Sequence, residues 1–89
     1  MEMNSIESIK KLTVESLLKD KHINKLYQNI MEQIIDAASN GQFEIITSLI
    51  KFDDCIEIEK IFRLLGYKPL RCLSSIISDS EIKLNISWL

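Results

Sequence analysis

Three residues divide this chain: it has two glycines, Gly41 and Gly66, and one proline, Pro69. Glycine reaches the left-handed backbone conformation in which many helices end, and proline cannot continue a helix. Nothing else in the sequence strongly interrupts regular structure, so we expect helices and strands with short connections. With 89 residues the chain has room for one hydrophobic core, and we predict a single domain over residues 1–89.

Two helices are predicted before Gly41. The first spans residues 5–19, where Asn4 and Glu7 have the spacing of a capping box. Residues 19–22 are polar and predict a loose junction. The second helix spans residues 23–39, because apolar residues recur there at helical spacing. These residues are Ile23, Leu26, Ile30, Ile34 and Ala37.

A third helix is predicted between the two glycines, over residues 54–65. Either Asp53 or Asp54 is expected to supply its N-terminal cap. Gly66 lies where a left-handed C-cap is expected, and Tyr67 lies where a hydrophobic residue often folds back onto the last turn, here onto Phe62.

The clearest strand is predicted at residues 82–88, because every second side chain there is apolar. These side chains are Ile82, Leu84, Ile86 and Trp88. Residues 70–77 are also apolar, and the turn residues 78–80 predict that both segments pair as an antiparallel hairpin. Residues 43–50 carry bulky apolar side chains on both alternating faces. This pattern favours an inner strand covered on both sides, with a helix as the competing interpretation.

The elements follow the order α-α-β-α-β-β. We therefore predict an α+β fold, in which a small sheet of about three strands carries the helices packed on one face. The first two strands and the third helix form a right-handed crossover if those strands are parallel.

Aliphatic residues are more abundant than a domain of this size needs. The chain is 46% hydrophobic and contains sixteen Ile and eleven Leu. Self-association would bury part of this surplus, so we expect a homo-oligomer, with residues 1–20 as a candidate oligomerisation arm. Packing of the first helix on its own domain and packing on a neighbouring subunit are both compatible with the sequence.

Charge and hydropathy bear on the class of partner. The formal net charge is −2, divided as +1 over residues 1–25, −5 over residues 26–62 and +2 over residues 63–89. A nucleic-acid partner is therefore not favoured. No stretch approaches the roughly 18 apolar residues that span a bilayer, and the N-terminus lacks the apolar run of a signal peptide. We expect a cytoplasmic protein with no membrane partner.

Residues suited to covalent or metal chemistry are few. Cys55 and Cys72 lie seventeen positions apart, and the single His22 completes no usual zinc spacing with them. The acids near the start of the third helix are expected there for electrostatic reasons, and both glycines are explained by helix ends rather than by a phosphate loop. We therefore predict no catalytic residues, no metal, no cofactor and no enzymatic activity.

Two groups of residues are candidates for binding. The first is a basic cluster for which a solvated surface is the commoner role: Lys10, Lys11, Lys19, Lys21, His22 and Lys25. The second contains residue types that are enriched in binding hot spots: Arg63, Tyr67, Lys68, Arg71 and Trp88. Trp88 is in phase with the apolar residues of its strand, so packing in the core is its competing role.

Residues 30–89 resemble a diffuse class of small phage-encoded accessory proteins. The resemblance rests on the Ala37-Ala38…Gly41 pattern, on Leu64-Leu65-Gly66-Tyr67, and on the terminal Ile86-Ser87-Trp88. The segment after Tyr67 is more apolar here than in that pattern. The class has no common catalytic residues, and what the resemblance implies is a setting: the cytoplasm of an infected bacterium.

The leading hypothesis from the sequence is a non-enzymatic phage accessory protein. It would bind and inhibit or sequester a host protein, including a component of antiviral defence. One alternative is an oligomer that encloses a nucleotide signal between its subunits. Another is a small DNA-binding regulator, which the negative net charge disfavours.

Overall fold

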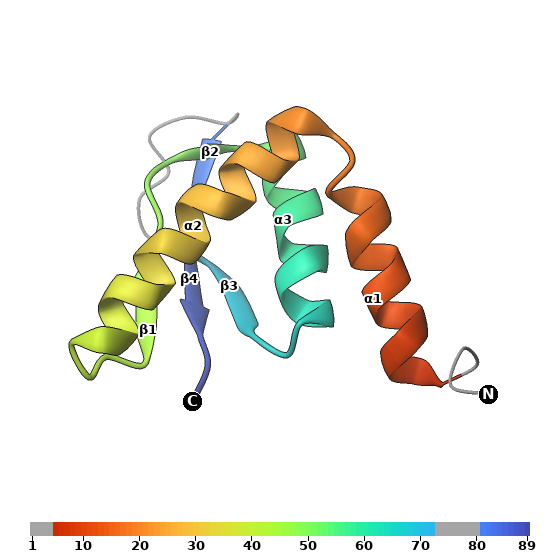
Figure 1. Ribbon diagram of the computed structural model, residues 1–89. Coiled ribbons are helices and arrows are strands. Elements are labelled where there is room, and N and C mark those ends of the chain that lie inside the picture. Colours follow the sequence, from red (N-terminus) through yellow and green to blue (C-terminus); the bar gives the residue numbers. More distant parts are fainter. Residues whose placement is uncertain (1–4, 73–80) are drawn as a thin grey trace.

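The computed structural model describes residues 5–72 and 81–89, and in this part of the chain three helices accompany a four-stranded antiparallel sheet (Figure 1). The elements in chain order are α1 (Ile6–Leu17), α2 (Lys21–Ser39), β1 (Glu44–Ile46), β2 (Ile50–Lys51), α3 (Phe52–Leu64), β3 (Lys68–Cys72) and β4 (Glu81–Ser87). The predicted α+β fold and its order of elements are confirmed. The ends of all three helices lie within two residues of the predicted ends.

The last strand, β4, lies at the centre of the sheet. β3 pairs with one of its edges, and β1 and β2 pair with the other, all antiparallel to it. β1 and β3 are therefore parallel to each other, as a crossover through α3 requires, but β4 lies between them. The predicted antiparallel pairing of the last two strands is confirmed by the register of β3 on β4.

The prediction for residues 43–50 is wrong in one respect: this segment forms an edge of the sheet and is not covered on both sides. It is extended, as predicted, but is divided into β1 and β2. Ile46 pairs with Asn85 and Ile50 with Ile82, so one extra residue is accommodated between the two strands, as in a β-bulge.

The buried Thr47 joins the two strands to β4. Its backbone N–H donates to the Leu84 carbonyl at 2.9 Å, and its side-chain oxygen accepts from the Leu84 N–H at 3.0 Å. The hydroxyl also donates to the Ser48 carbonyl at 2.9 Å. At the bulge a side-chain oxygen thus takes the place of a backbone carbonyl in the ladder.

The strand predicted at residues 70–77 begins earlier, at Lys68. The structure describes it as far as Cys72, so the rest of that segment and the turn predicted at residues 78–80 lie outside the described residues.

The two glycines end helices, as predicted. Gly66 has a φ of 98°, its N–H donates to the Arg63 carbonyl at 3.0 Å, and the Tyr67 N–H donates to the Phe62 carbonyl at 2.9 Å. This pair of bonds is a Schellman motif, and the Tyr67 ring folds back onto the Phe62 ring, with centroids 5.4 Å apart. Gly41, with a φ of 78°, ends α2 in the same way.

The starts of α1 and α3 differ from the predicted caps, and no cap was predicted for α2. Ser5 caps α1, and Asp20 caps α2 by accepting from the N–H groups of His22 and Ile23. α3 begins at Phe52 after Lys51, with no side-chain cap, so the aspartates at residues 53–54 lie inside its first turn.

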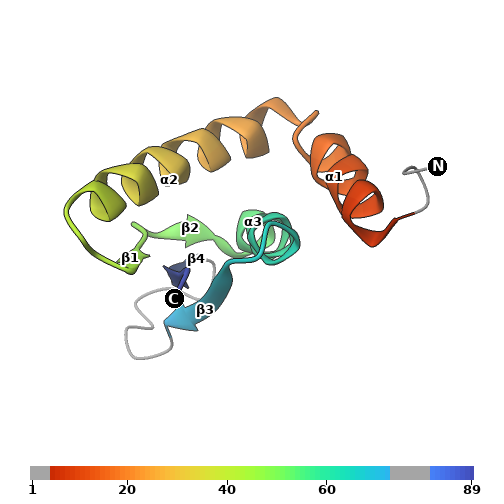
Figure 2. The same ribbon diagram turned by 60° about the horizontal axis from the view of Figure 1, so that its bottom comes forward.

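The helices form a layer on one face of the sheet (Figure 2). α2 packs on β1, α3 packs on β2, β3 and β4, and α1 packs on α3 of its own chain. The largest fully buried side chains of the core come from α3 and β4: Phe62, Ile58, Ile61, Leu84, Ile86 and Cys55. α1 contributes Val14 alone to the buried core.

We predict that Thr47→Val destabilises the fold by about 1–3 kcal/mol, because the Leu84 N–H is left without its acceptor in a buried position. The change keeps the shape of the side chain and removes only the hydroxyl. Chemical denaturation measures the free energy of unfolding, and amide hydrogen exchange should show faster exchange at Leu84.

Thr47→Ser is the matched control, because it removes a methyl group and keeps the oxygen. The Leu84 amide should stay protected in this variant. Equal protection of Leu84 in the Val and Ser variants would show that the hydroxyl is not the acceptor that matters.

Candidate functional site

The face of the sheet opposite the helices carries exposed apolar side chains. Residues paired directly across neighbouring strands share a face. Ile46 of β1 and Leu70 of β3 both pair with Asn85 of β4, so the three form one row across this open face. Ile46 is 61% exposed and Leu70 is 64% exposed. Sequence patterning missed this row because the two residues gain a common neighbour only through β4.

Polar contacts border the row on one side. Glu44 accepts a hydrogen bond from the Asn85 side-chain amide at 2.7 Å, and the Lys68 ammonium donates to the Leu89 carbonyl at 2.9 Å. A hollow of about 630 Å³ adjoins this end of the sheet; its described lining is Gln42, Phe43, Glu44, Ile45, Ile46 and Leu89. Phe43 and Leu89 are exposed. The open face therefore combines apolar side chains with polar groups held in place.

The five residues predicted as a binding group do not form one site. Tyr67 and Trp88 lie together on the helix side of the sheet, with ring centroids 6.3 Å apart. Both pack against the core, as the competing role predicts for Trp88. Lys68 lies on the open face, and Arg63 is exposed on α3.

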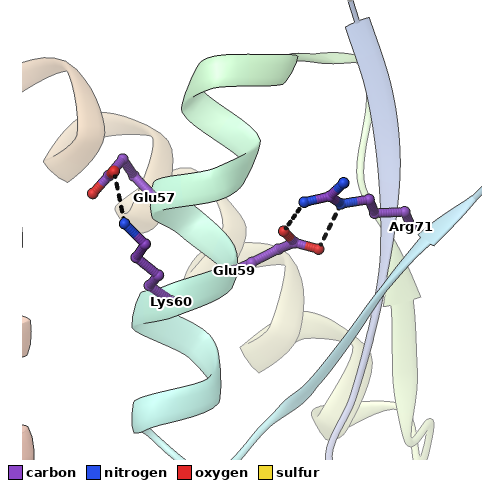
Figure 3. Close-up of polar contacts among 4 residues, drawn as sticks. All are labelled: Glu57, Glu59, Lys60 and Arg71. Atoms are coloured by element: carbon purple, nitrogen blue, oxygen red, sulfur yellow. Dashed lines mark hydrogen bonds and ion pairs between the residues drawn. The ribbon is translucent and has the colours of Figure 1, made fainter.

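Arg71, the fifth residue, ties β3 to α3 (Figure 3). Its Nε donates to Glu59 Oε2 at 3.0 Å and its Nη2 donates to Glu59 Oε1 at 2.8 Å, a bidentate pair. The Glu59 side chain is 5% exposed and the Arg71 side chain is 37% exposed. The guanidinium also lies 4.9 Å from the centroid of the Phe52 ring. The hydrogen bond with Glu59 raises the pKa of Arg71, so the guanidinium stays charged.

A buried thiol lies on the same helix as Glu59. Cys55 is fully buried, and burial raises the pKa of its thiol to about 11, with a further contribution from the Glu59 carboxylate. A thiol with this pKa is overwhelmingly protonated at neutral pH and is a poor nucleophile or metal ligand. Both cysteines are free, and Cys72 is half-buried at the end of β3.

His22 has a partner that the sequence did not predict. Its Nε2 lies 2.7 Å from Oδ2 of Asp54, which joins the first turn of α2 to the first turn of α3. The two residues are 32 positions apart, so no local pattern pairs them. His22 therefore helps to position two helices, although its side chain is largely exposed.

A groove of about 430 Å³, separate from the hollow at Phe43 and Leu89, lies between α2 and the β1–β2 segment. Leu26, Ile30 and Ile50 give it an apolar part, and Glu32 and Asp36 place carboxylates along it. These acids disfavour phosphate groups on electrostatic grounds.

Within residues 5–72 and 81–89, no group of three or more histidine, cysteine or acidic side chains could hold a metal ion. The helices of the same ranges include none that is long and apolar enough to cross a membrane. No family model matches the chain, and no curated protein or solved structure matches it significantly.

We predict that Arg71→Met lowers the melting temperature by about 5 °C or more, because it leaves the Glu59 carboxylate buried without its partner. Thermal unfolding followed by circular dichroism measures the change. Arg63→Met is the matched control: Arg63 has no ion pair with the described residues, and its melting temperature should shift by less than about 2 °C. Equal shifts in the two variants would mean that the Glu59–Arg71 pair contributes nothing beyond a surface contact.

We also predict that the folded Cys72→Ser variant reacts very slowly with a thiol reagent at pH 8. Its remaining thiol, Cys55, is buried with a pKa raised to about 11, so roughly one molecule in a thousand carries the thiolate at that pH. Colour release from a disulfide reagent measures the rate, and denaturant should release the full equivalent at once. Reaction at the same rate before and after unfolding would contradict the burial of Cys55.

Proposed function

We propose that this protein is a non-enzymatic binding protein that acts by covering a surface of another protein. The observation that carries the proposal is the open face of the sheet, where Ile46 and Leu70 are exposed on either side of Asn85. Within the described residues this face is covered by no helix, since α2 and α3 pack on the opposite face (Figure 2).

The composition of the face supports protein binding. Exposed apolar side chains set among polar groups are typical of protein–protein contacts, and here Ile46 and Leu70 flank the polar Asn85. The Glu44–Asn85 and Lys68–Leu89 hydrogen bonds hold the polar border in place, which reduces the entropy lost on binding. Both strands that carry the exposed residues are hydrogen-bonded to β4, so the contact requires little rearrangement of the backbone.

Inhibition by occlusion follows from this kind of surface. When the open face binds a partner, it covers part of the partner's surface and blocks other molecules that bind there. No chemical step is needed. The groups most suited to chemistry contribute instead to the fold: Glu59 pairs with Arg71, His22 with Asp54, and Cys55 lies in the core.

The proposed setting is the cytoplasm of a bacterium infected by a phage. It rests on the resemblance to small phage accessory proteins in the segments around Gly41, Gly66-Tyr67 and Trp88. The proposed partner is accordingly a host protein, with a component of antiviral defence as one candidate, and the proposed effect is inhibition or sequestration.

A nucleotide ligand is less well supported. The groove between α2 and the β1–β2 segment has the volume for a small ligand, but Glu32 and Asp36 line it and would repel phosphate. A host protein is therefore the partner that the described surfaces favour.

The test is capture of a host protein by the immobilised chain, followed by a measurement of affinity for the purified partner. We expect Ile46→Lys/Leu70→Lys to weaken binding about tenfold or more, because both anchors are replaced by charges on the contact surface. The melting temperature of the double variant checks that it stays folded. We expect it to do so, because both substituted residues are exposed.

Ile9→Lys/Leu12→Lys is the matched control, since it makes the same change at two exposed apolar residues of α1. It should bind the partner as the unmodified chain does. If no host protein is captured, or if the Ile46/Leu70 variant binds as tightly as the control, the proposal for the open face is wrong.

A further inference from the structure

The solvent face of α2 has an order of charges that is unfavourable within a single molecule. Lys21, Lys25, Gln28, Glu32 and Asp36 follow one another at spacings of three and four, so they form one row along the helix. All five are exposed, whereas the buried residues of α2 lie on the other side: Ile23, Ile30, Ile34 and Ala37. The row is basic toward the N-terminal end and acidic toward the C-terminal end.

Two electrostatic effects oppose this order. The positive end of the helix dipole is at the N-terminus, where Lys21 occupies the first turn, and the negative end is at the C-terminus, where Asp36 occupies the last turn. The N-cap Asp20 places one favourable carboxylate at the N-terminus, but within the helix α2 has no acid in its first turn and no basic residue in its last turn. In addition, Lys21 and Lys25 repel each other across one turn, as do Glu32 and Asp36.

No ion pair with the described residues compensates these four charges. The fold therefore gives no account of their order. A partner helix with the opposite order of charges would place an acidic side chain next to each lysine and a basic side chain next to each acid.

A second copy of the same helix has that order when it runs antiparallel. Lys21 and Lys25 are four residues apart, and so are Glu32 and Asp36. One register therefore places Lys21 opposite Asp36 of the second copy and Lys25 opposite its Glu32, with Gln28 near the two-fold axis. The symmetry repeats both pairs, and the two helix dipoles also oppose each other.

We propose that the protein forms a two-fold symmetric dimer through the antiparallel pairing of α2 with α2 of a second copy. The surface is available, because the five residues of the row are exposed and lie on the side of α2 away from its buried residues, with Glu32 and Asp36 also at the groove beside the β1–β2 segment. The helix α2 itself forms the outer side of the helix layer (Figure 2). Ile35, which is 60% exposed beside the row, adds apolar surface to the contact.

The expected affinity is modest. The nineteen residues of α2 span about 28 Å, and one helix pair of that length buries less than the roughly 800 Å² per partner of a standard interface. The dimer should therefore form at micromolar or higher concentration and weaken with added salt, which screens exposed charges.

Sedimentation velocity over about 10 to 500 µM protein, at low and at high salt, tests the proposal. The unmodified chain should show a concentration-dependent dimer at low salt. Lys21→Glu/Lys25→Glu and, separately, Glu32→Lys/Asp36→Lys should each raise the dissociation constant about tenfold or more, because like charges then face each other.

Mixing these two variants should restore association, since an acidic row then meets a basic row. The variant that carries all four changes should again form a homodimer. Neither double variant should melt at a lower temperature than the unmodified chain, because each change improves the match with the helix dipole. This result separates a lost dimer from a lost fold.

Lys11→Glu/Lys60→Glu is the control for the lysine variant, because it makes the same change in net charge at exposed residues outside the row. It also removes the exposed Glu57–Lys60 ion pair, so its melting temperature is measured alongside. It should dimerise as the unmodified chain does. A chain that stays monomeric at low salt would overturn the proposal. A dimer that persists in both charge-reversed variants would also overturn it. If that dimer is instead lost in Ile9→Asp/Leu12→Asp, self-association takes place through α1.

Discussion

All strand pairing in the described structure depends on β4. β1, β2 and β3 each bond to this strand, and none of them pairs with another strand within the described residues. Its Leu84 and Ile86 are fully buried beneath the helix layer. β1 and β4 are separated by about forty residues of sequence, so the sheet depends on contacts that are distant along the chain. Such contacts carry a loop-closure cost before they contribute to stability, which makes the fold cooperative and slower to form than a helical bundle.

α3 connects this sheet to the rest of the molecule. It packs on β2, β3 and β4 through one side and on α1 through another, and its Glu59 pairs with Arg71 on β3. His22 and Asp54 join its first turn to α2. The short helix α1, with Val14 as its one residue in the buried core, is held chiefly through α3. A helix of twelve residues is marginal alone in water, so its stability depends on this contact.

The sequence predicted those parts of the fold that a few neighbouring residues determine. The Schellman motif at Gly66 needs only Gly66, Tyr67 and Phe62, and the alternation of β4 needs only its own residues. The segments on which the proposed phage setting rests are local in the same way, since Gly41 and Gly66 end helices and Ile86 fills the core.

Features that depend on distant partners were beyond local patterns. Residues 43–50 look like a covered strand because both faces are apolar, but coverage is decided by where α2 and α3 lie. The bulge depends on the Thr47 hydroxyl meeting the Leu84 N–H, and the role of Arg71 depends on Glu59, twelve residues away on another element. The open-face row became visible only with the register of β1 and β3 on β4.

The two proposed surfaces lie on opposite sides of the molecule. The row lies on the exposed side of α2, in the helix layer, whereas Ile46 and Leu70 lie on the face of the sheet opposite that layer. A dimer formed through α2 would therefore leave both open faces free and directed away from each other. Such a dimer could hold two copies of a partner, or two sites of an oligomeric partner, with an avidity that exceeds the affinity of a single face. Charge order on α2 and apolar exposure on the sheet would then serve one mechanism, in which weak self-association strengthens occlusion at the second surface.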